Sequence, residues 1–189
     1  MSQSEYRLSL PARTETDHDP VVAALLSKAR AGIGMVPNMY ANMANAPGLL
    51  DTYLFGYAAF RAESGFSPAE QETVFLTISQ ANGCNYCVAA HSTIADMTKM
   101  PSEITDALRN GTPLPDPKLD ALAMFTRTML DTRGLPTRAD VDAFLAAGYT
   151  EQHVLQIVLA LAVKTISKYS NHLFHTPVDA AFAARTWGG

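Results

Sequence analysis

Cysteine and charge are both scarce in this chain. Two of the 189 residues are cysteines, and Asp, Glu, Lys and Arg together make up 17% of the sequence, with a net charge of -4. No cluster of Lys and Arg stands out, which excludes the electrostatic footprint of a nucleic-acid or anionic-membrane binder. We therefore expect a small substrate or a protein partner.

Signals for secretion and for a membrane span are also missing. The N-terminus, MSQSEYRLSLPARTETDHDP, lacks a basic stretch followed by an apolar one. Residues 73–95 carry no Asp, Glu, Lys or Arg, yet polar side chains interrupt them every few positions, unlike a membrane span. These features predict a cytoplasmic protein. Thiols stay reduced there, so a lone cysteine pair is more often catalytic or metal-binding than structural.

The length and the apolar content together predict one domain that associates with copies of itself. A chain of 189 residues can bury one full core, and 48% of its residues are hydrophobic. Association into a homo-oligomer would cover the apolar surplus. We expect an N-terminal arm over residues 1–18 and a single helical domain over residues 19–189.

Helix-start signals recur along the chain and predict an all-α fold. Proline follows a capping residue at two of these starts, and two carry an acidic residue at the third helical position as in a capping box. The predicted caps are Asp19, Ser67 with Glu70, Thr137 with Asp140, and Thr150. The one long loop signal is NGTPLPDPK, residues 110–118, where glycine and three prolines argue against a helix.

A weak internal repeat relates residues 65–87 to residues 148–170. The gapless alignment places Gly65 on Gly148 and both cysteines on serines. Two capped amphipathic helices look somewhat alike in any case, so a true duplication of a helix pair and a chance likeness both stay open.

Both cysteines lie in one segment with a histidine. Cys84 and Cys87 are spaced C-x-x-C, and His91 follows four residues later. Asn82-Gly83 predicts a chain reversal, after which both cysteines lie in the first turn of a new helix. The i+3 and i+4 spacings place both sulfurs and the imidazole on one helix face. Glu72, in the preceding helix, is the residue expected to orient His91.

A reactive cysteine has to be ionised at neutral pH. A free thiol with a pKa of about 8.5 is only a few per cent thiolate, and lowering that pKa by two units takes about 2.7 kcal/mol. A helix terminus supplies about 0.3–1 kcal/mol, so a neighbouring base or imidazolium has to supply the rest. His91, paired with Glu72, is the candidate.

Two plainer interpretations compete with a redox pair. Buried, inert cysteines are common in cytosolic helices, and one histidine on an apolar face is usually a packing residue. The second interpretation is a zinc site. Cys84, Cys87 and His91 offer three ligands, and the H-x-x-H pair of His172 and His175 could supply more. The isolated C-x-x-C beside a histidine favours redox chemistry, with no metal and no cofactor.

The motif E-x(11)-C-x-x-C-x(3)-H, formed by Glu72, Cys84, Cys87 and His91, resembles that of AhpD-like (alkylhydroperoxidase D-like) proteins in the carboxymuconolactone decarboxylase superfamily. The upstream GMVPNMYANMANAPGLLDTY is similar to the lead-in helices of the peroxidase-related members, so the resemblance covers about residues 25–180. The resemblance implies an all-helical fold, a trimer or hexamer, and thiol-dependent reduction of hydroperoxides.

By the same resemblance, Cys87 is the peroxidatic cysteine, Cys84 its disulfide partner, and His91 with Glu72 the proton relay. The partners implied are a hydroperoxide and a dithiol reductant, lipoyl-bearing or thioredoxin-like. One position departs from the pattern: Tyr86 stands where those peroxidases carry histidine, and a phenol does not shuttle protons at neutral pH. A disulfide reductase or redox sensor without peroxide turnover, and a non-catalytic module that binds a small ligand or metal, are therefore kept as alternatives.

Overall fold

Residues 5–188 are described by a computed structural model and fold almost entirely into helices. Within these residues there is no β-strand, and the all-α prediction is confirmed. The helices are α1 (Pro20–Ile33), α2 (Asn38–Met43), α3 (Pro47–Glu63), α4 (Pro68–Ala81), α5 (Asn85–Met97), α6 (Ser102–Asn110), α7 (Pro117–Asp131), α8 (Arg138–Ala146) and α9 (Glu151–Phe174), followed by the short 3-10 helix η1 (Ala180–Arg185).

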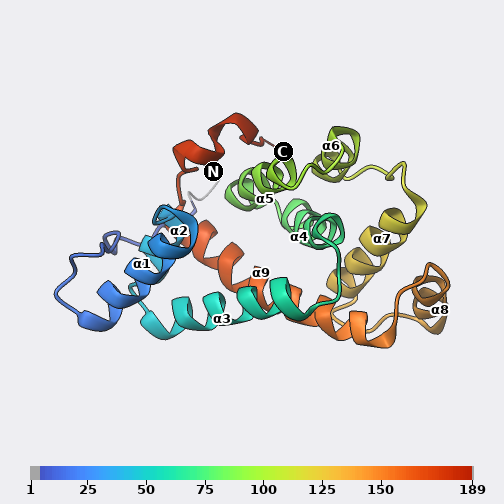
Figure 1. The fold of residues 1–189 in the computed structure, drawn as a ribbon, viewed down its shortest axis with the longest axis horizontal. Helices are drawn as coiled ribbons and strands as arrows, with labels where there is room; N and C mark the ends of the chain where they lie inside the picture. Colours follow the sequence, from blue (N-terminus) through green and yellow to red (C-terminus); the bar gives the residue numbers. More distant parts are fainter. Residues whose placement is uncertain (1–4, 189) are drawn as a thin grey trace.

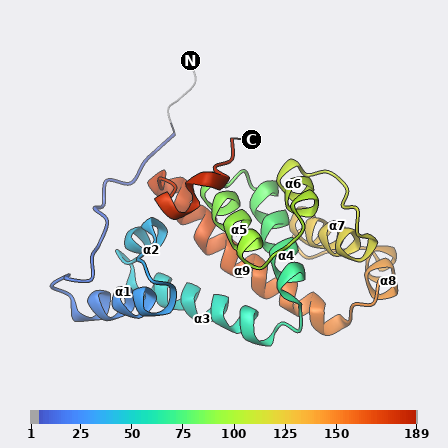
Figure 2. The ribbon, with the colours of Figure 1, turned by 45° about the horizontal axis from the view of Figure 1, so that its top comes forward.

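Helix α4 lies at the centre of the fold. It contacts α5, α6, α7 and α9, and its residues from Glu70 to Ser79 are all buried. The long helix α9 runs alongside α3 across the molecule, and η1 packs against α5 (Figures 1 and 2). Because α4 is packed against other helices on several sides, its sequence has no polar stripe that faces solvent.

The predicted helix starts are confirmed. The Asp19 side chain accepts a hydrogen bond from Val21 N, with Pro20 in the first turn of α1. Ser67 and Glu70 form the expected capping box of α4, and Thr137 begins α8 in the same way. Each box satisfies two backbone N–H groups that the first helical turn leaves without partners.

The predicted loop over residues 110–118 is too long at both ends. Asn110 is the last residue of α6, and Pro117 already opens α7 behind the N-cap Asp116. Proline is favoured in the first helical turn because the N–H that it lacks has no intrahelical partner there. Of the three prolines in the predicted loop, Pro117 therefore favours a helix start instead of excluding a helix.

The two segments of the weak repeat begin alike and end differently. Gly65 and Gly148 both have a left-handed backbone, and capped helices follow them. Residues 68–97 then form two helices with a break between them, whereas residues 151–174 form one unbroken helix. A duplicated helix pair is thus not found at residues 148–170, because nothing there corresponds to the Asn82-Gly83 break.

The first described residues, 5–19, contain no helix and are held by backbone hydrogen bonds. Leu8 N donates to Leu173 O at 2.8 Å, and Arg13 N donates to Ala41 O at 2.9 Å. The division into an arm and a domain at residues 18 and 19 stays a prediction. In this part of the chain and through residue 188, no helix has the length and apolar character needed to cross a membrane.

Candidate active site

The break between α4 and α5 positions both cysteines. Gly83 takes a left-handed backbone with φ of 61°, which ends α4 and turns the chain into α5. The sequence predicted Cys84 in the first turn of α5. In the structure Cys84 is the N-cap and lies one residue before that turn. Cys87 N donates a hydrogen bond to the Cys84 sulfur at 3.3 Å. Cysteine therefore takes the capping role that Ser or Asp usually fills.

Cys84 and Cys87 are joined as a disulfide, with 5.2 Å between their Cα atoms. Both side chains are buried, at 1% and 2% exposure. The N-cap position turns the Cys84 side chain back toward the first turn of α5, which brings the two sulfurs together. The start of α5 therefore holds the two cysteines in a geometry that a disulfide can join.

The expected contact between Glu72 and His91 is present. Helices α4 and α5 pack side by side, and His91 Nδ1 lies 2.9 Å from Glu72 Oε2 with both side chains buried. A carboxylate accepts the Nδ1 proton, so this contact assigns the hydrogen to Nδ1 and leaves Nε2 as the proton acceptor. Burial, helped by the charge of Lys164, lowers the pKa of His91 to about 4 despite the opposing effect of Glu72, so the ring is neutral.

Arg61 from α3 is the second partner of Glu72, and the sequence analysis did not find it. Its Nη2 lies 2.5 Å from Glu72 Oε1, and its guanidinium carbon stands 4.9 Å from the centre of the Tyr57 ring. Burial raises the pKa of Glu72, but His91 and Arg61 together outweigh burial and hold that pKa below its usual value. Glu72 is therefore an anion with two partners rather than an isolated buried charge.

Lys164 from α9 was also missed. Its side chain is 2% exposed, and its Nζ stands 5.8 Å from the centre of the Phe75 ring. Burial lowers the pKa of Lys164 from 10.5 to about 7, with Arg61 adding to the effect and Glu72 opposing it. The only sequence signal was one charged residue inside the apolar run VLQIVLALAVK.

Asn171 from α9 places an amide directly beside the disulfide. Its Nδ2 lies 3.5 Å from the Cys87 sulfur and 3.9 Å from the Cys84 sulfur. A donor aimed at sulfur favours thiolate over thiol. No motif or spacing in the sequence pointed to this residue, because 84 positions separate it from Cys87.

A cavity of about 110 Å³ lies between Cys87, His91 and Lys164. Cys87, His91 and Lys164 line it, and the rest of its wall is mostly aromatic or aliphatic, including Tyr40, Tyr53, Tyr57, Tyr86 and Phe182. Cys84 faces elsewhere, into a groove of about 640 Å³ that Asn171 also lines. A small molecule in the aromatic cavity would thus meet Cys87 and not Cys84.

Tyr86, the departure from the peroxidase pattern, is engaged in a structural contact. Its hydroxyl donates to Asp179 Oδ2 at 2.5 Å, and Asp179 also accepts from the backbone N of Asn38 at 3.1 Å. Burial and the Asp179 carboxylate raise the pKa of Tyr86 far above its usual value. The hydroxyl therefore stays protonated and ties α5 to the segment before η1.

The zinc alternative gains no support from the arrangement of the histidines. His172 lies in the last turn of α9, and His175 is the C-cap of that helix. Over residues 5–188, no three His, Cys, Asp or Glu side chains gather as a metal site requires.

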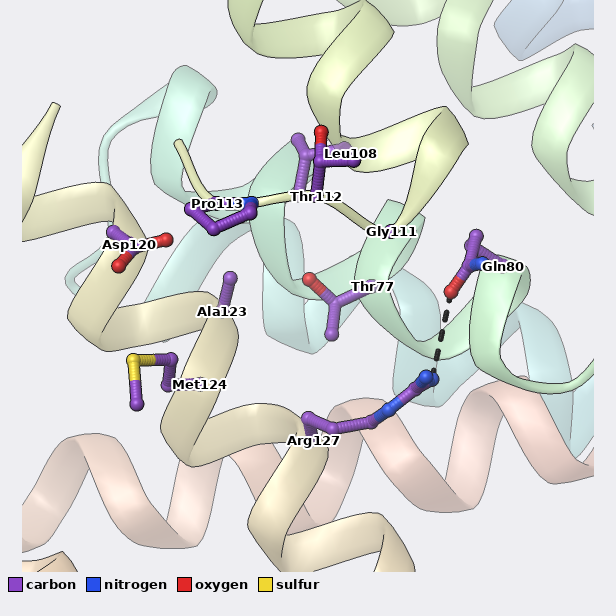
Figure 3. Close-up of a pocket in the computed structure, with 10 residues that line it drawn as sticks. All are labelled: Thr77, Gln80, Leu108, Gly111, Thr112, Pro113, Asp120, Ala123, Met124 and Arg127. Atoms are coloured by element: carbon purple, nitrogen blue, oxygen red, sulfur yellow. Dashed lines mark hydrogen bonds between the residues drawn. The ribbon is translucent and has the colours of Figure 1, made fainter. Parts of the chain in front are cut away.

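A larger cavity, of about 320 Å³, lies between α4, the end of α6 and α7 (Figure 3). Arg127 points across it toward Gln80, whose Oε1 accepts a hydrogen bond from Arg127 Nη1 at 3.5 Å. Gly111 closes one side, where a Cβ atom would come within 2.8 Å of Gln80 Nε2. The lining contains no cysteine or histidine, so this cavity is separate from the cysteine pair.

Comparison with known proteins supports the assignment made from the motif. Residues 48–126 match the model of the Carboxymuconolactone decarboxylase family. That region includes Glu72, Cys84, Cys87 and His91. No curated protein matches the chain.

Three solved structures share the fold. An AhpD-core, uncharacterized peroxidase-related protein from Ralstonia eutropha is 20% identical with a TM-score of 0.82, over 92% of this chain and 93% of that one. A peroxidase-related protein from a Silicibacter species is also 20% identical, with a TM-score of 0.73 over 97% and 96% of the two chains. The debrominase Bmp8, in complex with 2,3,4-tribromopyrrole, is 16% identical, with a TM-score of 0.76 over 96% and 97%.

The fold and the family match agree with each other. The chain has the all-helical AhpD-like fold, and the region around its cysteines matches the carboxymuconolactone decarboxylase family. The resemblance of this chain to AhpD-like members of that superfamily is confirmed.

Proposed function

We propose that the protein is a thiol-dependent oxidoreductase that reduces hydroperoxides through a dithiol–disulfide cycle of Cys84 and Cys87. The observation that carries this proposal is the joint placement of three features. A bonded C-x-x-C pair begins a helix, one of its cysteines lines an aromatic cavity, and a neutral histidine held by a buried carboxylate lines the same cavity.

In the first step, Cys87 acts as the nucleophile. His91 Nε2 accepts the thiol proton, and the new negative charge on sulfur is stabilised by the Asn171 amide and by the first turn of α5. The depressed pKa of His91 describes the disulfide state, and a thiolate beside the ring raises that pKa. The thiolate then attacks the terminal oxygen of the hydroperoxide, which gives Cys87 sulfenic acid and an alkoxide that takes up a proton to become an alcohol.

In the second step, Cys84 resolves the sulfenic acid. Its thiol attacks the Cys87 sulfur, a disulfide forms, and the hydroxyl leaves as water. The net reaction consumes two thiols and one hydroperoxide and yields one disulfide, one alcohol and one water. An external dithiol, lipoyl-bearing or thioredoxin-like, returns the pair to the reduced state by thiol–disulfide exchange.

Assembly into a trimer or hexamer belongs to the same proposal. Large apolar side chains on α3 and α9 are exposed, among them Phe55 at 77% and Leu155 at 68%. Burial of such side chains between copies is favourable by about 1.5–3 kcal/mol each. Light scattering coupled to gel filtration measures the number of copies directly.

A peroxide-consumption assay with a dithiol reductant tests the proposed reaction. Wild-type protein is expected to consume hydroperoxide catalytically, and Cys87→Ser is expected to lose that activity. Wild-type protein whose disulfide is cycled by dithiols, but which consumes no hydroperoxide, would instead be a disulfide reductase or redox sensor. Unchanged peroxide turnover in Cys87→Ser would overturn the role assigned to this residue.

Reductive dehalogenation of a small aromatic compound is the second candidate. The specific observation in its favour is the cavity beside Cys87, which four tyrosines and Phe182 line. In that reaction two thiols and one aryl bromide yield a disulfide, the hydrogen-substituted ring and hydrogen bromide. Bromide release from a brominated pyrrole in the presence of a dithiol would favour this candidate, and its absence beside peroxide turnover would exclude it.

A further inference from the structure

Lys164 places a charged amine in the cavity where the thiol chemistry is proposed to occur. It lines the same space of about 110 Å³ as Cys87 and His91, and only 2% of it is exposed. Within residues 5–188 its ammonium group makes no hydrogen bond, and it is surrounded by the charges of Glu72 and Arg61 and by the ring of Phe75. The amine is therefore free to interact with a molecule in the cavity.

The groups that face Lys164 come from three helices. Glu72 from α4 favours the charged form of the lysine, Arg61 from α3 opposes it, and His91 from α5 is neutral. Burial lowers the pKa of Lys164 to about 7. A buried ionisable side chain whose pKa is strongly shifted, in the wall of a cavity, is a common sign of a functional role. An amine that titrates near neutral pH both holds and releases a proton readily.

We propose that Lys164 is a catalytic acid, which donates a proton to the alkoxide that leaves when Cys87 attacks the hydroperoxide. This inference rests on the proposed peroxidase function. In the step, the Cys87 thiolate forms a bond to the terminal oxygen and the O–O bond breaks. The electron pair of that bond stays on the leaving oxygen, which takes a proton from the Lys164 ammonium to become an alcohol. The amine is then reprotonated from His91, which holds the proton taken earlier from Cys87.

Separate roles in the reaction explain why the cavity is lined by both an imidazole and an amine. His91, neutral and paired with Glu72, serves as the base for the thiol. Lys164 serves as the acid for the opposite end of the same reaction, where an alkoxide is a poor leaving group unless it is protonated. Lys164, from α9, would thereby supply the proton transfer that Tyr86 cannot supply at the position where the peroxidases carry histidine.

Oxidants with different leaving groups provide a test that a structural role of Lys164 cannot imitate. The reduced protein is desalted and mixed rapidly with either tert-butyl hydroperoxide, whose leaving group is an alkoxide, or peracetic acid, whose leaving group is the stable acetate anion. Loss of the two thiols is followed over time by alkylation and mass spectrometry. Wild-type protein, Lys164→Met, Lys164→Arg and the exposed control Lys28→Met are compared.

We expect Lys164→Met to react at least about 100-fold more slowly with tert-butyl hydroperoxide, the usual size of general acid catalysis. Its rate with peracetic acid should change less than about fivefold, because acetate needs no acid. Lys164→Arg keeps the charge but holds its proton far more tightly, so it should also lose at least about tenfold with tert-butyl hydroperoxide only. Lys28→Met should match wild-type protein with both oxidants.

Two results would overturn the inference. An equal loss with both oxidants would assign Lys164 a structural role, and full activity of Lys164→Arg with tert-butyl hydroperoxide would reduce the role to charge alone. A wild-type protein whose thiols react with neither oxidant would instead contradict the proposed function itself. The two failures are therefore distinguishable.

Discussion

Replacement of Lys164 by methionine should make the protein more stable. The difference between the ordinary lysine pKa of 10.5 and a folded pKa of about 7 corresponds to a cost of about 5 kcal/mol for the buried ammonium at low pH. Lys164→Met removes this cost, but part of the resulting gain in stability is lost because Glu72 loses the attraction of the ammonium. Replacement of buried charges by apolar side chains typically gains about 1–4 kcal/mol, and we expect Lys164→Met to fall in that range.

The sign of the pH dependence follows from the direction of the pKa change. Below about pH 7 the ammonium is charged in both the folded and the unfolded chain, so the folded state bears the full cost. As the pH rises from 7 to 10.5, the folded lysine is neutral while the unfolded one is still losing its proton, and the cost disappears. The stability gain of Lys164→Met is therefore greatest at neutral pH and below, and shrinks toward pH 10.

Urea unfolding of the oxidised protein measures this effect. Wild-type protein, Lys164→Met and the exposed control Lys28→Met are unfolded at pH 7 and pH 10, with the control expected within about 0.5 kcal/mol of wild type. A variant that is less stable than wild type at pH 7, or a gain of the same size at both pH values, would refute the reasoning. Together with slower peroxide reduction, a gain would mark Lys164 as a residue kept for activity at the expense of stability.

Three further changes have separate expected outcomes. Glu72→Gln should lower the free energy of unfolding at pH 7 by about 3–5 kcal/mol, because Arg61 and Lys164 lose their counter-ion. Since the pKa of Glu72 is lowered in the folded protein, this difference in stability from wild type should narrow as the pH falls below 4.5. Tyr86→Phe should cost about 1–3 kcal/mol through the lost bond to Asp179 and leave thiol oxidation rates within about twofold, a result that a rate drop would contradict. Gly111→Ala should lower the free energy of unfolding by about 1–2 kcal/mol in the same assay, because φ is +64° and the new Cβ would meet Gln80. The matched control Gly48→Ala has open space around its Cβ and should cause no loss of stability.

Local signals in the sequence predicted the helix starts and one half of the site. Capping boxes and prolines act within a single turn, so Ser67 with Glu70 could be assigned from their spacing alone. The pairing of Glu72 with His91 was also within reach, because a glycine turn between two helices brings their facing residues together. These predictions needed no knowledge of how distant helices pack.

The other half of the site depends on packing that no local pattern encodes. Arg61 comes from α3, while Lys164 and Asn171 come from α9. Only the positions of these two helices against α4 and α5 bring Arg61 to Glu72, Lys164 to the cavity beside Cys87, and Asn171 to the cysteines. Lys164 gave one usable signal, a charge in an otherwise apolar helix face. The sequence predicted Cys84 inside the first turn of α5 and not at its N-cap, because cysteine is not among the residues usually found at an N-cap.

Trapping of the sulfenic acid tests the central claim most directly. The reduced variants Cys84→Ser and Cys87→Ser are each exposed to one equivalent of tert-butyl hydroperoxide with dimedone present, and the modified residue is located by peptide mass spectrometry. The account predicts a dimedone adduct on Cys87 in Cys84→Ser and little reaction of Cys84 in Cys87→Ser. Adduct formation on Cys84 alone, or on neither cysteine, would contradict it.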